Sequence, residues 1–191
     1  MGILHLDMLK RRISLAIVGA VCAVSASPAR AQAINVDVAG GYSALSASSG
    51  SMPLGWFVSA GRDFNDLFGI VGEVAGNYKS TTFVNAVTTS LSEHTFLAGP
   101  RIVLASDKQT VSAHFLVGVA TASATGTGTF GRTTVTSSAS DTAICYEPGV
   151  GVDLDFNKST ALRLEANFRL VTANGSVNEF QFLVGVAHRF R

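Results

Sequence analysis

One arrangement of residues in the chain suggests nucleophilic catalysis: Ser112, His114 and Glu147. A serine becomes a nucleophile when a histidine takes its proton and a carboxylate orients that histidine. Ser112 and His114 are two residues apart, so on a strand they share one face with their Cα atoms about 7 Å apart. That separation is too long for the close contact that catalysis needs. We therefore predict a polar interior role for all three residues and no enzymatic activity, with catalysis kept as the alternative.

No other motif of the chain indicates a cofactor or a metal. Gly126, Gly128 and Gly131 follow no strand-to-helix transition, so they do not form a nucleotide-binding loop. The histidines and carboxylates do not have metal-ligand spacing, and we expect neither a metal nor a cofactor. Once the leader described next is removed, Cys145 is the one remaining cysteine, which excludes an intrachain disulfide and a CxxC or zinc cluster.

The first 31 residues have the features of a secretory signal peptide. Residues 10–12 form a positive n-region, and residues 13–24 form an apolar h-region that is too short to act as a membrane anchor. Small residues at the expected spacing predict cleavage after Ala31 or Ala33. We therefore expect residues 32–191 to form one exported domain.

The composition is apolar without any long apolar segment. The chain has 191 residues, of which 47% are hydrophobic and 14% charged, against roughly 25% charged in an average soluble protein. No segment after the leader reaches the roughly 18 uninterrupted apolar residues of a membrane helix. Without the leader the chain has ten basic and twelve acidic residues, a net charge of about −2. Because it has no basic patch, nucleic acid is not an expected partner.

The elements that must position the polar residues are strands, because apolar and polar residues alternate with a period of two. In residues 162–170, for example, Leu162, Leu164 and Phe168 alternate with Arg163 and Arg169. The same alternation predicts eight strands, at about residues 34–45, 54–62, 67–79, 94–105, 110–122, 142–156, 160–171 and 178–190.

The connections between these strands are unequal. Short turns are expected at residues 63–66, 106–109 and 157–159, and longer Ser/Thr-rich connections at 46–51, 80–93 and 123–141. An even number of strands with short turns at one end and long loops at the other is typical of transmembrane β-barrels. We predict an all-β, eight-stranded antiparallel up-and-down transmembrane β-barrel, closed by pairing of the first and last strands. A soluble lipocalin-like barrel or sandwich is the alternative fold.

If the apolar faces look outward at lipid, the polar faces fill the lumen. The lumen then receives both signs of charge, from Asp37, Glu73, Arg101, His114, Glu147, Asp153, Arg163, Glu165, Arg169, Glu179, Gln181 and Arg189. Buried charges must pair, so we expect Arg101, Arg163 and Arg169 to pair with Glu73, Glu147 and Glu165 in some combination. We expect Gly99, Gly118, Gly149, Gly151 and Gly185 to leave room for the long arginine side chains. A lumen filled in this way is plugged.

Aromatic residues are expected at both ends of the strands. They occur at the loop ends (Tyr42, Trp56, Tyr78, Phe96) and at the turn ends (Phe68, Phe156, Phe190). Amphipathic rings favour the two membrane–water interfaces. Two aromatic belts are therefore predicted.

With the strands in place, the chain resembles the small outer-membrane β-barrel family of Gram-negative bacteria, the fold class of the OmpA transmembrane domain and OmpX. The resemblance covers the chain after the leader and is carried by residues 38–42 (VAGGY), 96–101 (FLAGPR), 149–153 (GVGVD) and the last strand. Members of this family end in an aromatic residue after alternating hydrophobics, which the barrel-assembly machinery reads. Phe182, Val184, Val186 and Phe190 fit that signal, whereas His188 and Arg191 depart from it.

The resemblance implies a bacterial outer-membrane location, contact with outer-membrane lipid and an encounter with the barrel-assembly machinery. It leaves three functions open. We expect a structural or surface-interaction barrel with a plugged lumen, with a narrow channel for small solutes as the first alternative and a lipid-modifying enzyme as the second. The loop at residues 123–141, which contains Phe130 and Arg132, is either decoration or a contact for a surface ligand.

Overall fold

The computed structural model describes residues 35–47, 50–83, 87–106, 108–130, 133–173 and 175–190, so the predicted signal peptide and its cleavage site lie outside the described residues. All the described regular structure is β-strand. The strands are β1 (Asn35–Ala47), β2 (Gly50–Met52), β3 (Leu54–Asp63), β4 (Phe68–Phe83), β5 (Val87–Ala105), β6 (Gln109–Phe130), β7 (Thr133–Asp155), β8 (Thr160–Ala173) and β9 (Gly175–Phe190). Within these ranges, no helix is long and apolar enough to cross a membrane.

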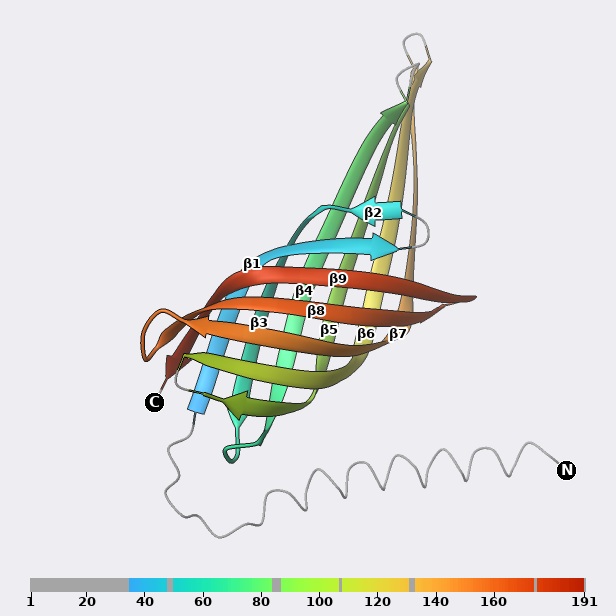
Figure 1. Ribbon diagram of the computed structural model, residues 1–191. Helices are drawn as coiled ribbons and strands as arrows, with labels where there is room; N and C mark the ends of the chain where they lie inside the picture. The colour runs from blue at the N-terminus through green and yellow to red at the C-terminus, as the bar shows by residue number, and fades with distance from the viewer. Residues whose placement is uncertain are drawn as a thin grey trace, which may run out of the picture. The chain divides into compact units, whose positions relative to one another are not determined.

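The strands form a closed antiparallel barrel (Figure 1). Each long strand pairs with the next in sequence, and β1 pairs with β9 in a register that runs from Val36↔Phe190 to Ala47↔Glu179. The eight predicted strands and the closing pair are therefore confirmed. The short strand β2 is additional and pairs with the loop end of β1, at Leu45↔Met52. Closure leaves no unpaired edge around the barrel wall, as a sheet in lipid requires.

The two faces of each strand separate cleanly. On β1, Asp37, Ala39 and Ser43 are at most 4% exposed, whereas Val38 and Tyr42 are 39% and 45% exposed. The same holds around the barrel, where the outward residues are large and apolar, among them Val58, Ile70, Phe96, Leu104, Val150, Phe182 and Val186. The alternative of a soluble barrel or sandwich is wrong, because its apolar faces would form the interior.

The short turns at one end of the barrel use the same device twice. Asn65 Oδ1 accepts hydrogen bonds from the backbone N–H groups of Leu67 (2.9 Å) and Phe68 (2.7 Å). Asn157 Oδ1 accepts equivalent bonds from Ser159 and Thr160, both 2.9 Å. An asparagine that mimics a backbone turn in this way stabilises a tight reversal. The turns predicted at these two places are confirmed.

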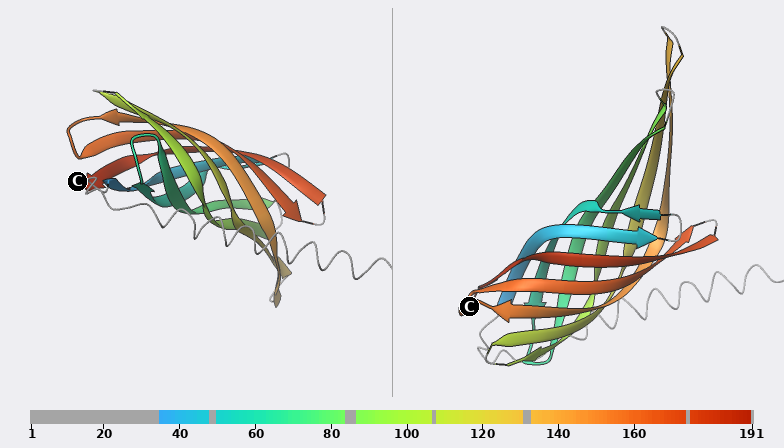
Figure 2. Two further views of the ribbon diagram at one scale, coloured as in Figure 1. Left: turned by 90° about the horizontal axis from the view of Figure 1, so that it is seen from below. Right: turned by 45° about the horizontal axis from the view of Figure 1, so that its top comes forward.

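At the opposite end, the strands are much longer than predicted. The prediction followed the alternation of large apolar residues, which stops where the barrel ends. The connections expected at residues 80–93 and 123–141 are instead hairpin strands, and β6 and β7 stay paired from Gln109↔Leu154 to Phe130↔Thr133. Figure 2 shows β4, β5, β6 and β7 continuing beyond the barrel as a projecting sheet. About nine to eleven tilted residues suffice to cross a bilayer, whereas β6 and β7 contain 22 and 23 residues.

The predicted aromatic residues lie on the outer face at both ends of the barrel. At the loop end, Trp56 Nε1 donates a hydrogen bond to the Tyr78 hydroxyl at 3.2 Å, and the Tyr78 ring packs edge-on against His94 at 5.5 Å between centroids. Tyr42 lies directly opposite Trp56 on the neighbouring strand. At the turn end, Phe68, Phe156 and Phe190 are 50%, 68% and 53% exposed.

Candidate functional site: the charged lumen and the projecting sheet

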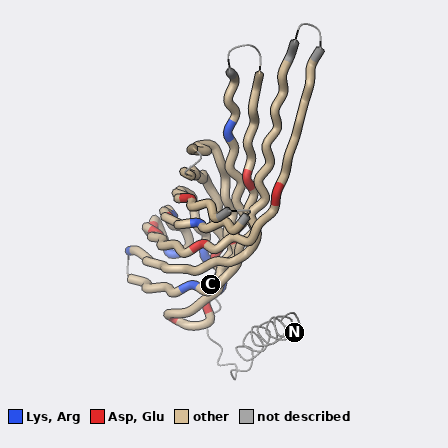
Figure 3. The backbone as a smooth tube through the Cα atoms, turned by 90° about the vertical axis from the view of Figure 1, so that its right-hand side faces the viewer, with Lys and Arg blue, Asp and Glu red and all other residues tan. Residues whose placement is uncertain are grey.

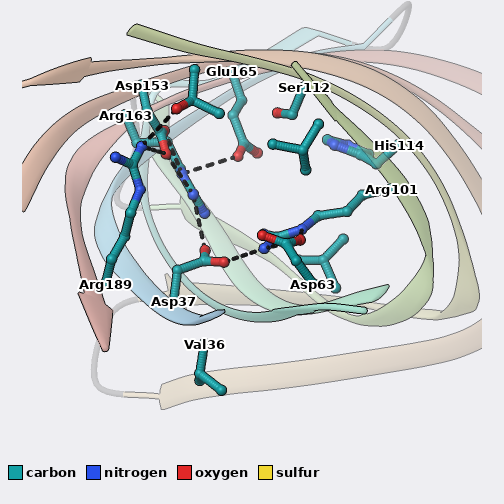
Figure 4. A pocket seen from close by; sticks show the side chains of 13 residues that line it. Val36, Asp37, Asp63, Arg101, Ser112, His114, Asp153, Arg163, Glu165 and Arg189 are labelled. Atoms are coloured by element: carbon teal, nitrogen blue, oxygen red, sulfur yellow. Dashed lines mark hydrogen bonds and ion pairs between the residues drawn. The ribbon is translucent and has the colours of Figure 1, made fainter. Parts of the chain in front are cut away.

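One cluster of ion pairs fills the turn end of the lumen (Figure 4). Arg101, from β5, bonds to Asp37 on β1, and its guanidinium also lies 2.7 Å from Asp63 at the end of β3. Asp37 uses its other oxygen to accept a bond of 2.9 Å from Arg163 on β8. A single carboxylate therefore joins two arginines that come from opposite parts of the sequence.

Arg163 extends this cluster across β7 to β9. Its Nε and Nη2 donate to the two carboxylate oxygens of Asp153 at 2.8 and 2.9 Å, a bidentate arrangement between directly opposed residues. Glu165 lies 3.6 Å from the same Nε. Arg189 donates to Asp153 at 3.0 Å and to Asp155 at 2.6 Å, which completes the cluster at its exposed rim.

Gly61 provides the space that Arg101 occupies. A Cβ at Gly61 would overlap the guanidinium and stand 2.6 Å from Arg101 Cζ and 2.8 Å from Asp37 Oδ1. The glycines predicted to make room for arginines serve other neighbours, since a Cβ at Gly149 would overlap His114 and Asn167, and one at Gly151 would meet Ser112. A Cβ at Gly99, Gly118 or Gly185 would overlap the backbone of a neighbouring strand.

A second cluster surrounds Arg169 at the loop end of the lumen. Its Nε donates to Glu147 at 2.6 Å, its Nη1 to Glu93 at 2.8 Å and its Nη2 to Gln181 at 2.8 Å. Glu179 is close but too far for a hydrogen bond, with 3.9 Å between its Oε2 and Arg169 Nη1. Three carboxylates therefore share one guanidinium, and Glu93 was not among the site residues predicted from the sequence.

The predicted pairing between arginines and glutamates differs from the structure in two respects. Arg169 pairs with Glu147 and Arg163 with Glu165, but Arg101 pairs with two aspartates instead of a glutamate. Glu73 is 3% exposed, has no ion pair with any described residue, and leaves its Oε1 without a hydrogen bond. Arg101 lies near the turn end, where the aspartates are, whereas Glu73 lies further along β4.

Apolar side chains share the lumen with the charges. Phe57 and Leu183 belong to one buried cluster, and Leu97, Leu116 and Cys145 to another. These residues occupy the inward positions of their strands between charged neighbours. The lumen residues named from the sequence were polar, and these apolar residues accompany them on the inward face.

Ser112, His114 and Glu147 are not joined into a catalytic arrangement. No hydrogen bond connects these three residues in the described structure, and both oxygens of Glu147 are bonded elsewhere, to Asn167 at 3.1 Å and to Arg169. His114 Nε2 is buried without a partner. Ser112 and His114 line a cavity of about 40 Å³ at the turn-end cluster. That volume admits a few water molecules and no larger substrate.

Within the described residues, no group of three or more His, Cys, Asp or Glu side chains could hold a metal ion. The carboxylates of both clusters are directed instead at arginines. The arrangement therefore acts by mutual neutralisation of charge inside the wall of the barrel.

The projecting sheet has a second kind of surface, which we call the hydroxyl face. Its Ser and Thr side chains lie opposite one another in rows across the strands, as in Thr82↔Thr88, Thr88↔Thr127 and Thr127↔Thr136. Hydrogen bonds of 3.0 to 3.4 Å join pairs within the rows, at Ser80–Ser90, Thr82–Thr88, Thr121–Thr142, Ser123–Ser140 and Thr127–Thr136. By strand geometry, the rows repeat at about 7 Å along the strands, and neighbouring hydroxyls at about 4.8 Å across them.

The opposite side of the β6–β7 hairpin is an alanine face. Ala120 lies opposite Ala143, and Ala124 lies opposite Ala139. The hairpin is therefore amphipathic in the manner of a strand pair, with methyl groups on one side and hydroxyl groups on the other. This alternation of Ala or Gly with Thr or Ser, visible in residues 120–128, was the signal that sequence reasoning missed.

A closed antiparallel barrel with an apolar outer face, an ion-paired lumen and unequal ends defines the class of transmembrane β-barrels. The chain belongs to the outer membrane protein beta-barrel domain family, whose model matches residues 14–190. The resemblance drawn from the sequence is thus confirmed, and the family places the protein in the bacterial outer membrane. No curated protein sequence matches the chain.

Solved structures share this fold at low identity. Ail, the attachment invasion locus protein of Yersinia pestis, in complex with the heparin analogue sucrose octasulfate, is 18% identical over 83% of this chain and 100% of its own, with a TM-score of 0.63. Neisserial surface protein A is 15% identical over 83% and 98%, with a TM-score of 0.56. The outer membrane protease OmpT from Escherichia coli is 8% identical over 86% and 99%, with a TM-score of 0.50. At these identities the likeness shows the fold alone.

Proposed function

We propose that the protein is a non-conducting surface-interaction barrel that holds the projecting β4–β7 sheet outside the outer membrane. The observation that carries this proposal is the length of β6 and β7, which remain paired for about twice the span of a bilayer. The ion pairs of Arg101, Arg163 and Arg169 close the lumen and stiffen the base of the sheet. The proposal includes no catalytic activity.

The hydroxyl face indicates the chemistry of the partner. Lys79 is the one Lys or Arg in the described residues of the projecting sheet, and Figure 3 shows charge concentrated in the barrel and sparse beyond it. Regular rows of neutral donors and acceptors suit an uncharged polar ligand such as the hydroxyl groups of a glycan. Ail is seen with a heparin analogue, sucrose octasulfate, and sulfate groups are bound best by cationic side chains. We therefore expect neutral glycans to bind here in preference to sulfated ones.

Export and membrane insertion depend on the predicted leader and on the last strand. We propose export through cleavage of the signal peptide after Ala31 or Ala33, followed by recognition of β9 by the barrel-assembly machinery. In support, Phe182, Val186 and Phe190 face outward at more than 50% exposure. The His188 ring packs edge-on against Phe190 at 4.7 Å, so the histidine adds to an aromatic surface at this end.

The test uses the full barrel and a shortened version in which residues 80–90 and 122–141 are each replaced by a two-residue turn. Both proteins should shift in mobility between unboiled and boiled samples on a denaturing gel. Binding of labelled neutral and sulfated glycans to whole cells should depend on the long hairpins and favour the neutral sugars. Equal binding by the shortened barrel would contradict a role for the projecting sheet.

Closure of the lumen is tested separately in planar lipid bilayers. The purified barrel should show no unitary current, whereas truncation of the loop-end plug by the pair Arg169→Ala and Glu147→Ala should raise ion leakage. Regular single-channel steps from the unaltered protein would favour the narrow-channel alternative instead.

A further inference from the structure

The loop end of the lumen contains a cavity, which we call the vestibule. It has a volume of about 400 Å³ and is partly open. Its walls are mostly apolar, formed by the alanine face of β6 and β7 together with Leu91, Val171 and Val177. Small alanine side chains leave this space empty where leucine or valine would fill it. A concave, largely apolar cavity with a few polar groups is the usual form of a small-molecule site.

The charged groups of the vestibule all have the same sign. Glu93, Asp141 and Glu179 line it, and no Lys, Arg or His does so among the described residues. The nearest guanidinium, that of Arg169, uses its three nitrogens on Glu93, Glu147 and Gln181. Carboxylates outnumber guanidinium groups beside the vestibule, since Glu93, Glu147 and Glu179 all lie near Arg169.

Glu179 has an acceptor left over. The residue is 6% exposed, and its Oε2 is buried without a hydrogen-bond partner. The separation of 3.9 Å from Arg169 Nη1 is too long for a bond. A buried acceptor without a donor costs free energy, which a ligand N–H group can recover. An anion would meet several carboxylates here, and a neutral apolar molecule would leave the oxygen unsatisfied.

We infer that the vestibule binds a small hydrophobic amine in its protonated form. Its ammonium group donates to Glu179, and its hydrocarbon body packs on the alanine face. The inference goes beyond the surface role proposed above and does not depend on it, because the vestibule faces the lumen side of the hairpin. An ammonium group has three donors, which match the carboxylates of Glu179 and Glu93. Methyl-lined walls suit a compact body that has no polar atoms of its own.

The probe that tests this inference is 1-adamantylammonium, compared with neutral 1-adamantanol and with anionic adamantane-1-carboxylate. The protein is placed in lipid nanodiscs, and binding is followed by the methyl NMR signals of ¹³C-labelled alanines and by calorimetry against empty nanodiscs. We expect saturable binding of the cation, shifts confined to the alanines of the vestibule such as Ala120, Ala124 and Ala143, and affinity at least about tenfold above that of the alcohol.

Three variants locate the site. Glu179→Gln should weaken the cation about tenfold or more and remove the preference over the alcohol. Ala122→Leu fills the vestibule from an exposed wall position and should abolish binding while the barrel still shifts on heating. Glu73→Gln removes another buried, unpaired carboxylate that does not line the vestibule, so it should leave binding unchanged.

Equal affinity for all three probes, or no saturable binding above that of empty nanodiscs, would overturn the inference. Undiminished binding to the Ala122→Leu barrel would overturn it as well, because the cation would then sit elsewhere. None of these outcomes bears on glycan binding by whole cells, so failure here is distinguishable from failure of the surface role.

Discussion

Arg169 and Glu147 form the most deeply buried ion pair among the described residues, with side chains that are 1% and 0% exposed and 2.6 Å between Nε and Oε2. The two residues lie on adjacent strands, β8 and β7, and the same guanidinium reaches across the lumen to Glu93 on β5. With its bond to Gln181 on β9, this one side chain ties together four strands of the wall at the base of the projecting sheet.

Removal of Arg169 should therefore be costly. Arg169→Met leaves Glu93, Glu147 and Glu179 buried together without a cation, and we expect a loss of about 3–5 kcal/mol in the free energy of unfolding. Urea unfolding in lipid vesicles, followed by the fluorescence of the single tryptophan, measures this loss. Arg189→Met is the control, since Arg189 lies at the rim with 17% of its side chain exposed and should lose about 1 kcal/mol or less. Equal losses in the two variants would contradict the central role of Arg169.

Removal of the charge at Glu73 and at Glu147 should have different effects on the free energy of unfolding. Both carboxylates are buried, but Glu147 has an arginine and an amide as partners, whereas Glu73 has no ion pair with any described residue. Glu73→Gln should leave stability unchanged or raise it by about 1 kcal/mol, because a desolvated charge is removed. Glu147→Gln should destabilise by about 2–3 kcal/mol. The same urea titration compares them, and a large loss for Glu73→Gln would show that this carboxylate has a partner of its own.

A methyl group at Gly61 should disturb the turn-end cluster. Gly61→Ala places a Cβ into the guanidinium of Arg101, which is held on both sides by Asp37 and Asp63. We expect a loss of about 1–3 kcal/mol, the usual cost of overpacking, and a lower temperature for the gel-mobility shift. Gly72→Ala is the matched control within the barrel wall, since its Cβ would meet only Leu97 O at an ordinary 3.8 Å. If both variants shifted at the same temperature as the parent, close packing at Gly61 would be refuted.

The membrane position of the barrel can be read from Trp56, the only tryptophan of the chain. Its indole lies on the outer face, 38% exposed, and bonds to Tyr78 in the aromatic group at the loop end. We expect lipids that carry a quencher near the headgroup to reduce its fluorescence more than lipids quenched at the chain ends. Tyr78→Phe should change the emission wavelength without changing this depth. Stronger quenching by lipids labelled at the ends of their acyl chains would contradict an interfacial position of the aromatic residues at the loop end.

Much of the barrel wall could be predicted from the sequence, because the pattern that defines it is local. A strand presents alternate residues to opposite sides, so the spacing of residues such as Val38, Tyr42 and Asp37 already separates the lipid face from the lumen. Closure followed from the same pattern, since a sheet edge in lipid leaves backbone groups without partners. The tight turns at Asn65 and Asn157 are also local and were found.

The projecting sheet was missed because its strands carry no large apolar residues to mark their period. Residues 120–128 alternate Ala or Gly with Thr or Ser, a pattern that is easily mistaken for a polar loop. Threonine favours extended backbone, and each hydroxyl row gains hydrogen bonds only when neighbouring strands are in register. This pairing between strands extends β4–β7 beyond the barrel.

The sequence by itself determined which residues face the lumen, whereas the tertiary structure decided which of them meet. Arg101 and Asp37 are 64 residues apart and on strands that are not neighbours, and they touch because closure of the barrel brings their side chains to one depth at the turn end. Depth in the lumen depends on strand tilt and on the register of every pair around the wall. Alternation along one strand carries no information about this depth. The sequence therefore could not show that Arg101 pairs with aspartates, or that Glu73 has no ion pair with any described residue.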